Sequence, residues 1–310
     1  MNMPHLHLLL NHVPTVGTVI AVAILLLSLF RRNEGMRRVS LELYCVIALL
    51  TLPAYLSGVG TATILEFQEG VSRAIMDRHH DAAILASIGM LLSGGSAWIG
   101  LWQTRRLSRP SGVAVTSVLL FSVVTVALMA RAATLGGEIR HPEIVGDPEA
   151  SLIAADPYIA ATVAGWVTGK TWLWPACEVL HFVGLWVLFG VLVLTNLRLV
   201  GFMPSAPFAA FHRLLPWAAL ALGVNTVTGM MFVIAAPGQY LENISFFWKI
   251  GLLLLAGANL IYLTVFDAPW SVKAGDHAPL IQRAMAVSSI ALWIGVMYFG
   301  RMLPFIGNAF

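Results

Sequence analysis

Charge and cysteine are both scarce in this sequence. Only 11% of its 310 residues are charged and 58% are hydrophobic, whereas soluble domains carry about 25% charged residues. The composition therefore excludes an ordinary soluble domain and predicts a chain that lies in a lipid bilayer. The two cysteines, Cys45 and Cys177, both fall in long apolar stretches, so neither a disulfide framework nor covalently attached haem is expected. The pI near 9.1 reflects arginines between those stretches, and no nucleic-acid partner is expected.

Eight apolar stretches are long enough to cross a bilayer as helices, which takes about 20 residues each. The alternation typical of membrane strands over about ten residues is missing. We therefore predict an all-α, multi-pass membrane protein with two four-helix bundles, at 1–145 and 172–310, joined by a loop at 146–171. The predicted spans are 13–30, 41–60, 82–102, 112–134, 172–195, 214–235, 246–266 and 284–304. Between spans two and three, Ile64, Phe67, Val71 and Ile75 recur at helical spacing, which predicts an amphipathic helix on the membrane surface.

The arginines decide the expected orientation. Eleven of the eighteen Lys and Arg residues fall in the loops that follow spans one, three, five and seven, and eleven of the fifteen acids fall on the opposite side. Because positively charged loops stay in the cytoplasm, both termini are expected to face outward. The predicted location is the bacterial inner membrane, with the termini at its periplasmic face.

Three histidine motifs lie where predicted spans meet water, all on the outer side. His12 stands in NHVP before span one, His79 and His80 stand in RHHDAA before span three, and His141 follows span four in IRHPE. Imidazole nitrogen is the common protein ligand of haem iron, zinc and copper. These four residues are therefore candidate ligands of a metal ion or a haem. The alternative is that they only form hydrogen bonds at the membrane interface.

Three further residues are candidates because ionisable groups are expensive in lipid. His181 lies about ten residues inside span five, or about 15 Å along a helix, and is a candidate buried ligand of haem or metal. Its alternative role is a hydrogen bond to a neighbouring helix. Arg131 and Lys249, near the outer ends of spans four and seven, are candidate partners of haem propionates or of a quinone oxygen. Their alternative role is to snorkel, with the stem in lipid and the charge in water.

Two resemblances add to these expectations. Through NHVP, LPAYLSGVGT, HHDAA and GGEIRHPEI, the first half resembles a widespread bacterial family of four-span membrane proteins without an assigned function. The matching positions are His12, His80, Arg140, His141 and Glu143. Through LHFVGLWVLF, NLR, TG and FWKIGLLLLAGAN, the second half resembles another bacterial membrane family, distantly similar to the copper-resistance D-type proteins. The resemblances imply a fusion of two four-span modules, each with a candidate haem-ligating histidine.

Together these features favour a haem b-containing electron-transfer subunit that links the quinone pool to a periplasmic partner, such as cytochrome c or an oxidoreductase subunit. One or two haems and a bound quinone are expected, as in the cytochrome b subunit of a quinol-linked oxidoreductase. The acidic loop from Glu138 to Asp156 is a candidate docking surface for a basic partner. The alternatives are a copper or other metal transport or tolerance protein, a zinc hydrolase that uses the outer histidines with Glu143, and a non-catalytic membrane anchor.

Overall fold

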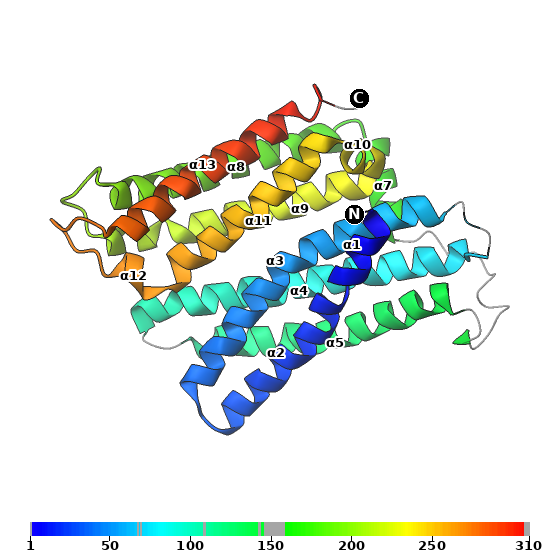
Figure 1. Cartoon of the computed structure of the whole chain (residues 1–310), viewed down its shortest axis with the longest axis horizontal. Helices are drawn as coiled ribbons and strands as arrows, with labels where there is room; N and C mark the ends of the chain where they lie inside the picture. Colours follow the sequence, from blue (N-terminus) through cyan, green and yellow to red (C-terminus); the bar gives the residue numbers. More distant parts are fainter. Residues whose placement is uncertain are drawn as a thin grey trace. The chain divides into compact units, whose positions relative to one another are not determined.

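The computed structural model describes residues 2–66, 68, 70–107, 110–141, 144–145 and 159–306. These residues form helices and no strand. Eight helical segments are long and apolar enough to cross a membrane, which confirms the predicted all-α, multi-pass architecture (Figure 1). The chain divides into an N-terminal unit, Met1–Ala160, and a C-terminal unit, Ala161–Phe310. Of the expected loop 146–171, residues 146–158 lie outside the described part.

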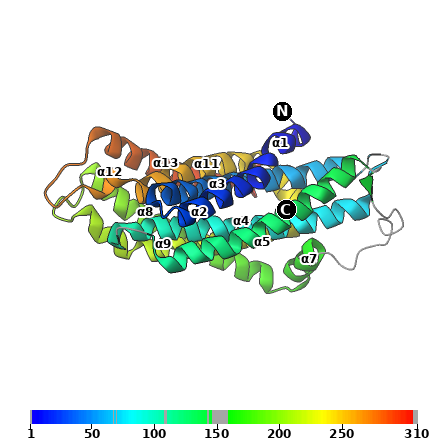
Figure 2. The same ribbon diagram turned by 90° about the horizontal axis from the view of Figure 1, so that it is seen from below.

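The N-terminal unit is a four-helix bundle with a short helix added at one end. Neighbours along the chain pack together, α5 returns to α2, and α1 packs on α3 (Figure 2). Asn11 separates α1 from α2, while Asn33 and Ser111 begin α3 and α5 by accepting hydrogen bonds from backbone amides. The helices are α1 (Met3–Leu10), α2 (His12–Phe30), α3 (Glu34–Leu65), α4 (Arg73–Leu107) and α5 (Gly112–Arg140).

Shape and internal hydrogen bonds hold this bundle together, because lipid tails leave little hydrophobic driving force between helices. At Gly94 of α4, an added Cβ would overlap the side chain of Ala48, so α3 and α4 contact each other directly there. The hydroxyl of Thr51 donates to the carbonyl of Ile47 at 2.8 Å, one turn earlier in the same helix. The Thr51 hydroxyl is therefore satisfied within its own helix, where no water reaches it.

The predicted amphipathic surface helix between spans two and three is wrong. Ile64 still belongs to α3 and Ile75 already belongs to α4, and an ion pair between Glu66 and Arg73 links the two helix ends. Phe67 lies outside the described residues. The reason for the error is that helical spacing of apolar residues is the same in an interfacial helix and in the last turns of a spanning helix.

The C-terminal unit arranges its four long helices in the packing order α9–α8–α13–α11. The short α10 contacts the ends of both α9 and α11. The first two residues of α7 belong to the N-terminal unit, and the rest of α7 belongs to the C-terminal unit. The described elements of the C-terminal unit are α7 (Ile159–Gly169), α8 (Leu173–Val200), η2 (Phe208–Arg213), α9 (Leu215–Ala235), α10 (Pro237–Leu241), α11 (Ile244–Val265), α12 (Asp267–Trp270) and α13 (Leu280–Met302).

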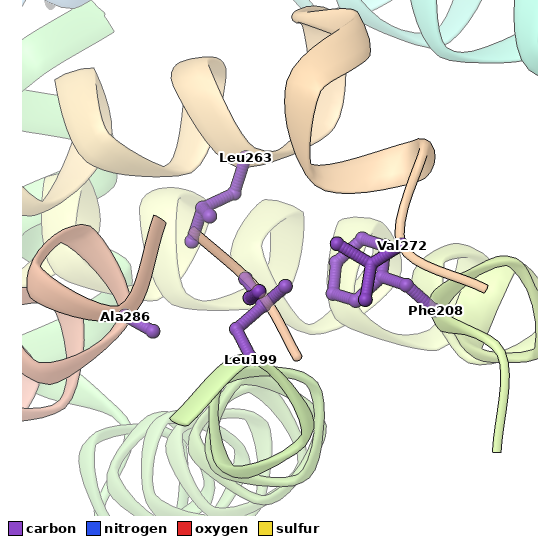
Figure 3. Close-up of a cluster of buried hydrophobic side chains, with 6 residues drawn as sticks. Leu199, Phe208, Leu263, Val272 and Ala286 are labelled. Atoms are coloured by element: carbon purple, nitrogen blue, oxygen red, sulfur yellow. The ribbon is translucent and has the colours of Figure 1, made fainter. Parts of the chain in front are cut away.

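A fully buried arginine organises the loop end of the C-terminal unit. The Arg198 guanidinium donates to the backbone carbonyls of Ala206, Lys273 and Asp276, with the Lys273 bond at 2.8 Å. Next to it lies a cluster of buried apolar side chains: Leu199, Phe208, Leu263, Val272, Ala278 and Ala286 (Figure 3). The arginine therefore ties the α8–α9 loop to the α12–α13 loop over this cluster.

We predict that Arg198→Met destabilises the protein, because the three carbonyls would lose their donor inside a closed core. An orphaned buried acceptor costs about 1–3 kcal/mol, so we expect a loss of about 3 kcal/mol in total. Thermal unfolding in detergent measures the effect as a lower melting temperature. Arg213→Met is the matched control, since Arg213 is exposed at the same loop end. Equal melting temperatures for the two variants would contradict the prediction.

Candidate functional site

The N-terminal unit contains a cavity of about 520 Å³, within the range of about 300–1,000 Å³ typical of ligand pockets. It lies at the bundle end where α1, α2 and α4 begin and where α3 and α5 end. Five histidines line it, namely His7, His12, His79, His80 and His141. The structure thus brings together the four histidines that the sequence singled out in this half, and it adds His7.

His7 is held by the end of α3. Its Nδ1 lies 3.1 Å from the carbonyl oxygen of Ala54. A carbonyl can only accept, so Nδ1 carries the hydrogen and Nε2 keeps its lone pair. The ring also lies against Gly58, where an added Cβ would stand only 2.9 Å from Cε1 of His7. The short helix α1, capped by the side chain of Asn2, is what presents this imidazole to the cavity.

His79 of α4 has the same arrangement, with α5 in the place of α3. Its Nδ1 donates to the carbonyl of Ala132 on α5 at 2.9 Å, which again leaves Nε2 with the lone pair. The ring lies against Gly136, where an added Cβ would stand 3.1 Å from Cε1. Both His7 and His79 line the same cavity. The cavity therefore holds two imidazoles that are fixed in the same way.

His80 and Asp81, which follow His79 on α4, contact other partners, because the side chains of successive helical residues are rotated by about 100° about the helix axis. His80 forms a hydrogen bond through Nε2 with the Tyr55 hydroxyl of α3 at 3.2 Å, and both residues line the cavity. Asp81 accepts from the amides of Ile159 at 2.9 Å and Ala160 at 3.3 Å, at the start of α7. The triplet thus connects α4 with α5, α3 and α7.

The remaining candidates of this unit lie at the rim or outside the cavity. His12, Arg140 and His141 line it and are exposed. Arg131 is exposed on α5 and does not line the cavity. Glu143, the candidate partner of the outer histidines, lies outside the described residues.

Three-ligand metal sites find no support in the described ranges. No group of three or more His, Cys, Asp or Glu residues there converges on a position that could hold a metal ion. The combination of His12, His80 and His141 proposed from the sequence is therefore not assembled as a zinc or copper site.

His181 belongs to the C-terminal unit and has partners of its own. Its Nδ1 lies 2.8 Å from the Thr228 hydroxyl on α9, and its ring meets that of Phe232 edge-on. Lys249 on α11 is half-buried, with its stem over Gly300 of α13. The sequence identified both residues, although it favoured haem ligation for His181.

Two members of the N-terminal cavity, His7 and Tyr55, were missed by the sequence interpretation. His7 stands five residues before His12, near the beginning of the chain. The available signal was the repetition of histidine in HLHLLLNH, but the break at Asn11 that turns α1 onto α3 is not evident in that pattern. Tyr55 follows a proline inside an apolar stretch and looks like a packing residue.

No protein-family model matches this chain. No curated protein and no solved structure matches it either. The resemblance to two bacterial families stays a prediction, and the function has to be argued from the geometry of the two units.

We predict that Asp81→Ala loosens the start of α7. Capping hydrogen bonds to a helix start contribute about 1 kcal/mol, which corresponds to roughly fivefold faster local opening. Hydrogen exchange at residues 159–160, followed by mass spectrometry in detergent, measures this. Asp77→Ala, one turn earlier on α4, is the control because Asp77 does not cap the described amides of α7. Unchanged exchange in Asp81→Ala would show that α7 is held by other contacts.

Proposed function

We propose that the N-terminal unit binds a haem b and that the chain transfers electrons in a membrane. The observation that carries the proposal is the matched pair of His7 and His79 in one cavity. Histidines that ligate a metal usually donate their other ring N–H to a carbonyl or carboxylate, which fixes the ring and increases its basicity. Both imidazoles have that hydrogen bond, and no described residue bonds to either Nε2.

The surroundings fit a flat and largely apolar group. Alanine and glycine residues of α3, α4 and α5 form much of the lining, and Gly58 and Gly136 let the rings of His7 and His79 lie close against α3 and α5. Arg140 at the rim is suited to a propionate, because its guanidinium can donate two parallel hydrogen bonds. When bound, a haem supplies reversible one-electron chemistry, tuned by its axial ligands and by burial. The chain's own residues fix the two imidazoles and exclude water.

The proposed electron path runs between the quinone pool and a periplasmic redox partner, such as cytochrome c or an oxidoreductase subunit. The arginine-rich loops support an orientation with the cavity toward the periplasm. They favour the cytoplasmic side, and the cavity lies at the other end of the N-terminal bundle. The proposed location is therefore the bacterial inner membrane, with the haem near the periplasmic face. Copper transport has less support, since the described residues assemble no three-ligand site.

We predict that the purified full-length protein shows the α-band of a reduced b-type haem and that His7→Ala and His79→Ala each lower the haem content at least tenfold. The reason is that each variant removes one axial imidazole. Pyridine haemochrome spectra measure the content per chain. His5→Ala is the matched control, because His5 is exposed and lies outside the cavity lining.

Rescue separates ligation from folding in this test. Added imidazole should restore the band in His79→Ala if the residue acts as a ligand. A colourless wild-type protein would falsify the proposal. Loss of the band in His12→Ala or His141→Ala, with normal haem in the His7 and His79 variants, would transfer ligation to the rim residues.

We predict that Gly136→Ala also lowers haem content, by about fivefold or more, without unfolding the protein. The new methyl group would press on Cε1 of His79 and turn the imidazole away from its present position. Gly95→Ala is the control, because no atom beyond the neighbouring backbone of its own helix lies within 4 Å of its added Cβ. Both substitutions gain about 1 kcal/mol of helix propensity, so a difference in haem content reports the cavity. Full haem content in Gly136→Ala would contradict the assigned ligand.

A further inference from the structure

Ser87 on α4 is the exception among the buried hydroxyl groups of the N-terminal unit. The other buried serines and threonines that the structure describes there each donate to a backbone carbonyl: Thr18, Ser28, Ser40, Thr51, Ser57, Ser93, Ser122 and Thr125. Ser87 is only 6% exposed, and its hydroxyl has no hydrogen-bond partner among the described residues. A buried polar group of this kind is costly unless a ligand or an ordered water completes it.

The unpaired hydroxyl is open to the cavity of the histidines. Ser87 lines that cavity, and its Oγ is not among the unpaired polar atoms that the chain closes off completely. His80 and Ala83 line the cavity as well, seven and four residues earlier on α4, which is the spacing of one helix face. Whatever occupies the cavity can therefore reach this hydroxyl.

Ser87 lies at the inner end of the cavity. On α3, α4 and α5, the lining residues farthest from the rim are Thr51, Ser87 and Met129, and all three are buried. None of them carries a charge, so an ionised group placed among them would have no counter-charge in a medium of low dielectric constant. The inner end is therefore suited to a neutral group.

The cationic side chain of the cavity lies at the opposite end. Arg140 is the only lysine or arginine among the described lining residues, and it ends α5 at the rim. Ser87 is eight residues inward from His79 on α4, or about 12 Å along the helix axis. A haem in this cavity is thus expected to place its propionates at the rim and its other edge toward Ser87.

We propose that Ser87 donates a hydrogen bond to a neutral oxygen on the haem edge opposite the propionates, as in a hydroxyalkyl or acyl substituent. The vinyl groups of haem b offer no oxygen, so they would leave the hydroxyl unpaired. A carboxylate would accept the bond but would bring an unpaired charge into the bundle. The inference rests on the proposed function for the macrocycle and its two axial imidazoles, and it replaces the vinyl edge of haem b by an oxygenated one.

Competition between two iron porphyrins for the full-length chain, made without haem and kept in detergent, tests this inference. Haematohaem carries hydroxyethyl groups where mesohaem carries ethyl groups, and the propionates of the two are identical. Ser87→Ala should reduce the preference for haematohaem over mesohaem by about fivefold, because one net hydrogen bond contributes about this much to binding. Titrations followed at the Soret band measure both affinities.

Ser93→Ala is the matched control. Ser93 is a fully buried serine of the same helix, it donates to the carbonyl of Gly89 at 2.9 Å, and it lies outside the cavity lining. Its variant should show the same preference as the wild type. Alanine favours a helix more than serine does, so both variants should fold, and melting temperatures check this.

A vibrational measurement reports the hydrogen bond directly. An iron porphyrin with acetyl groups in the vinyl positions should show a carbonyl stretching band at lower frequency in the wild-type chain than in Ser87→Ala. Resonance Raman spectra of the two complexes make the comparison, and identical carbonyl bands would overturn the inference.

The competition experiment also keeps the two proposals apart. An unchanged preference in Ser87→Ala, with both porphyrins bound, would overturn the inference and leave the proposed function standing. An equal loss of preference in Ser93→Ala would overturn the assignment to Ser87 in the same way. Binding of neither porphyrin to the wild-type chain would overturn the proposed function and, with it, the inference.

Discussion

The backbone carbonyl, as an acceptor with a second lone pair, is the group on which the described polar side chains of both units depend. In a bilayer, helical backbone groups bond to one another, and water is not there to satisfy polar side chains. Donors must therefore share carbonyl oxygens that already belong to a helix or loop. His7 and His79 do so at Ala54 and Ala132, and Arg198 does so in the loops of the C-terminal unit. The same constraint fixes the candidate ligands and closes a core.

The three successive residues His79, His80 and Asp81 form hydrogen bonds to three different helices. Because each residue is turned by about 100° from the last, the three side chains reach α5, α3 and the start of α7. The candidate ligand is thus fixed by the same turn of helix that joins these elements. A cofactor that pulled on His79 would act on the packing of α4 and α5, so binding and bundle stability are coupled.

The sequence was sufficient for the spans and for the gathering of histidines at one end, because hydropathy and the alternation of helix direction determine both. It was not sufficient for the roles within that group. His12 and His80 stood in the more distinctive motifs, yet His7 and His79 have the carbonyl-bonded rings. Which nitrogen is free depends on the rotation of each helix about its axis, and α1 is too short for periodicity to fix that rotation. Orientation across the membrane stays a prediction from the arginines.

The imidazoles of the two units differ in the group that Nδ1 contacts. His7 and His79 each bond through Nδ1 to a helix carbonyl and line the same cavity, and neutral imidazoles of this kind are common metal ligands. In the C-terminal unit, Nδ1 of His181 bonds to the hydroxyl of Thr228 on α9 and not to a backbone carbonyl. His181 therefore differs from His7 and His79 in what fixes its ring, and its role as a haem ligand stays a prediction.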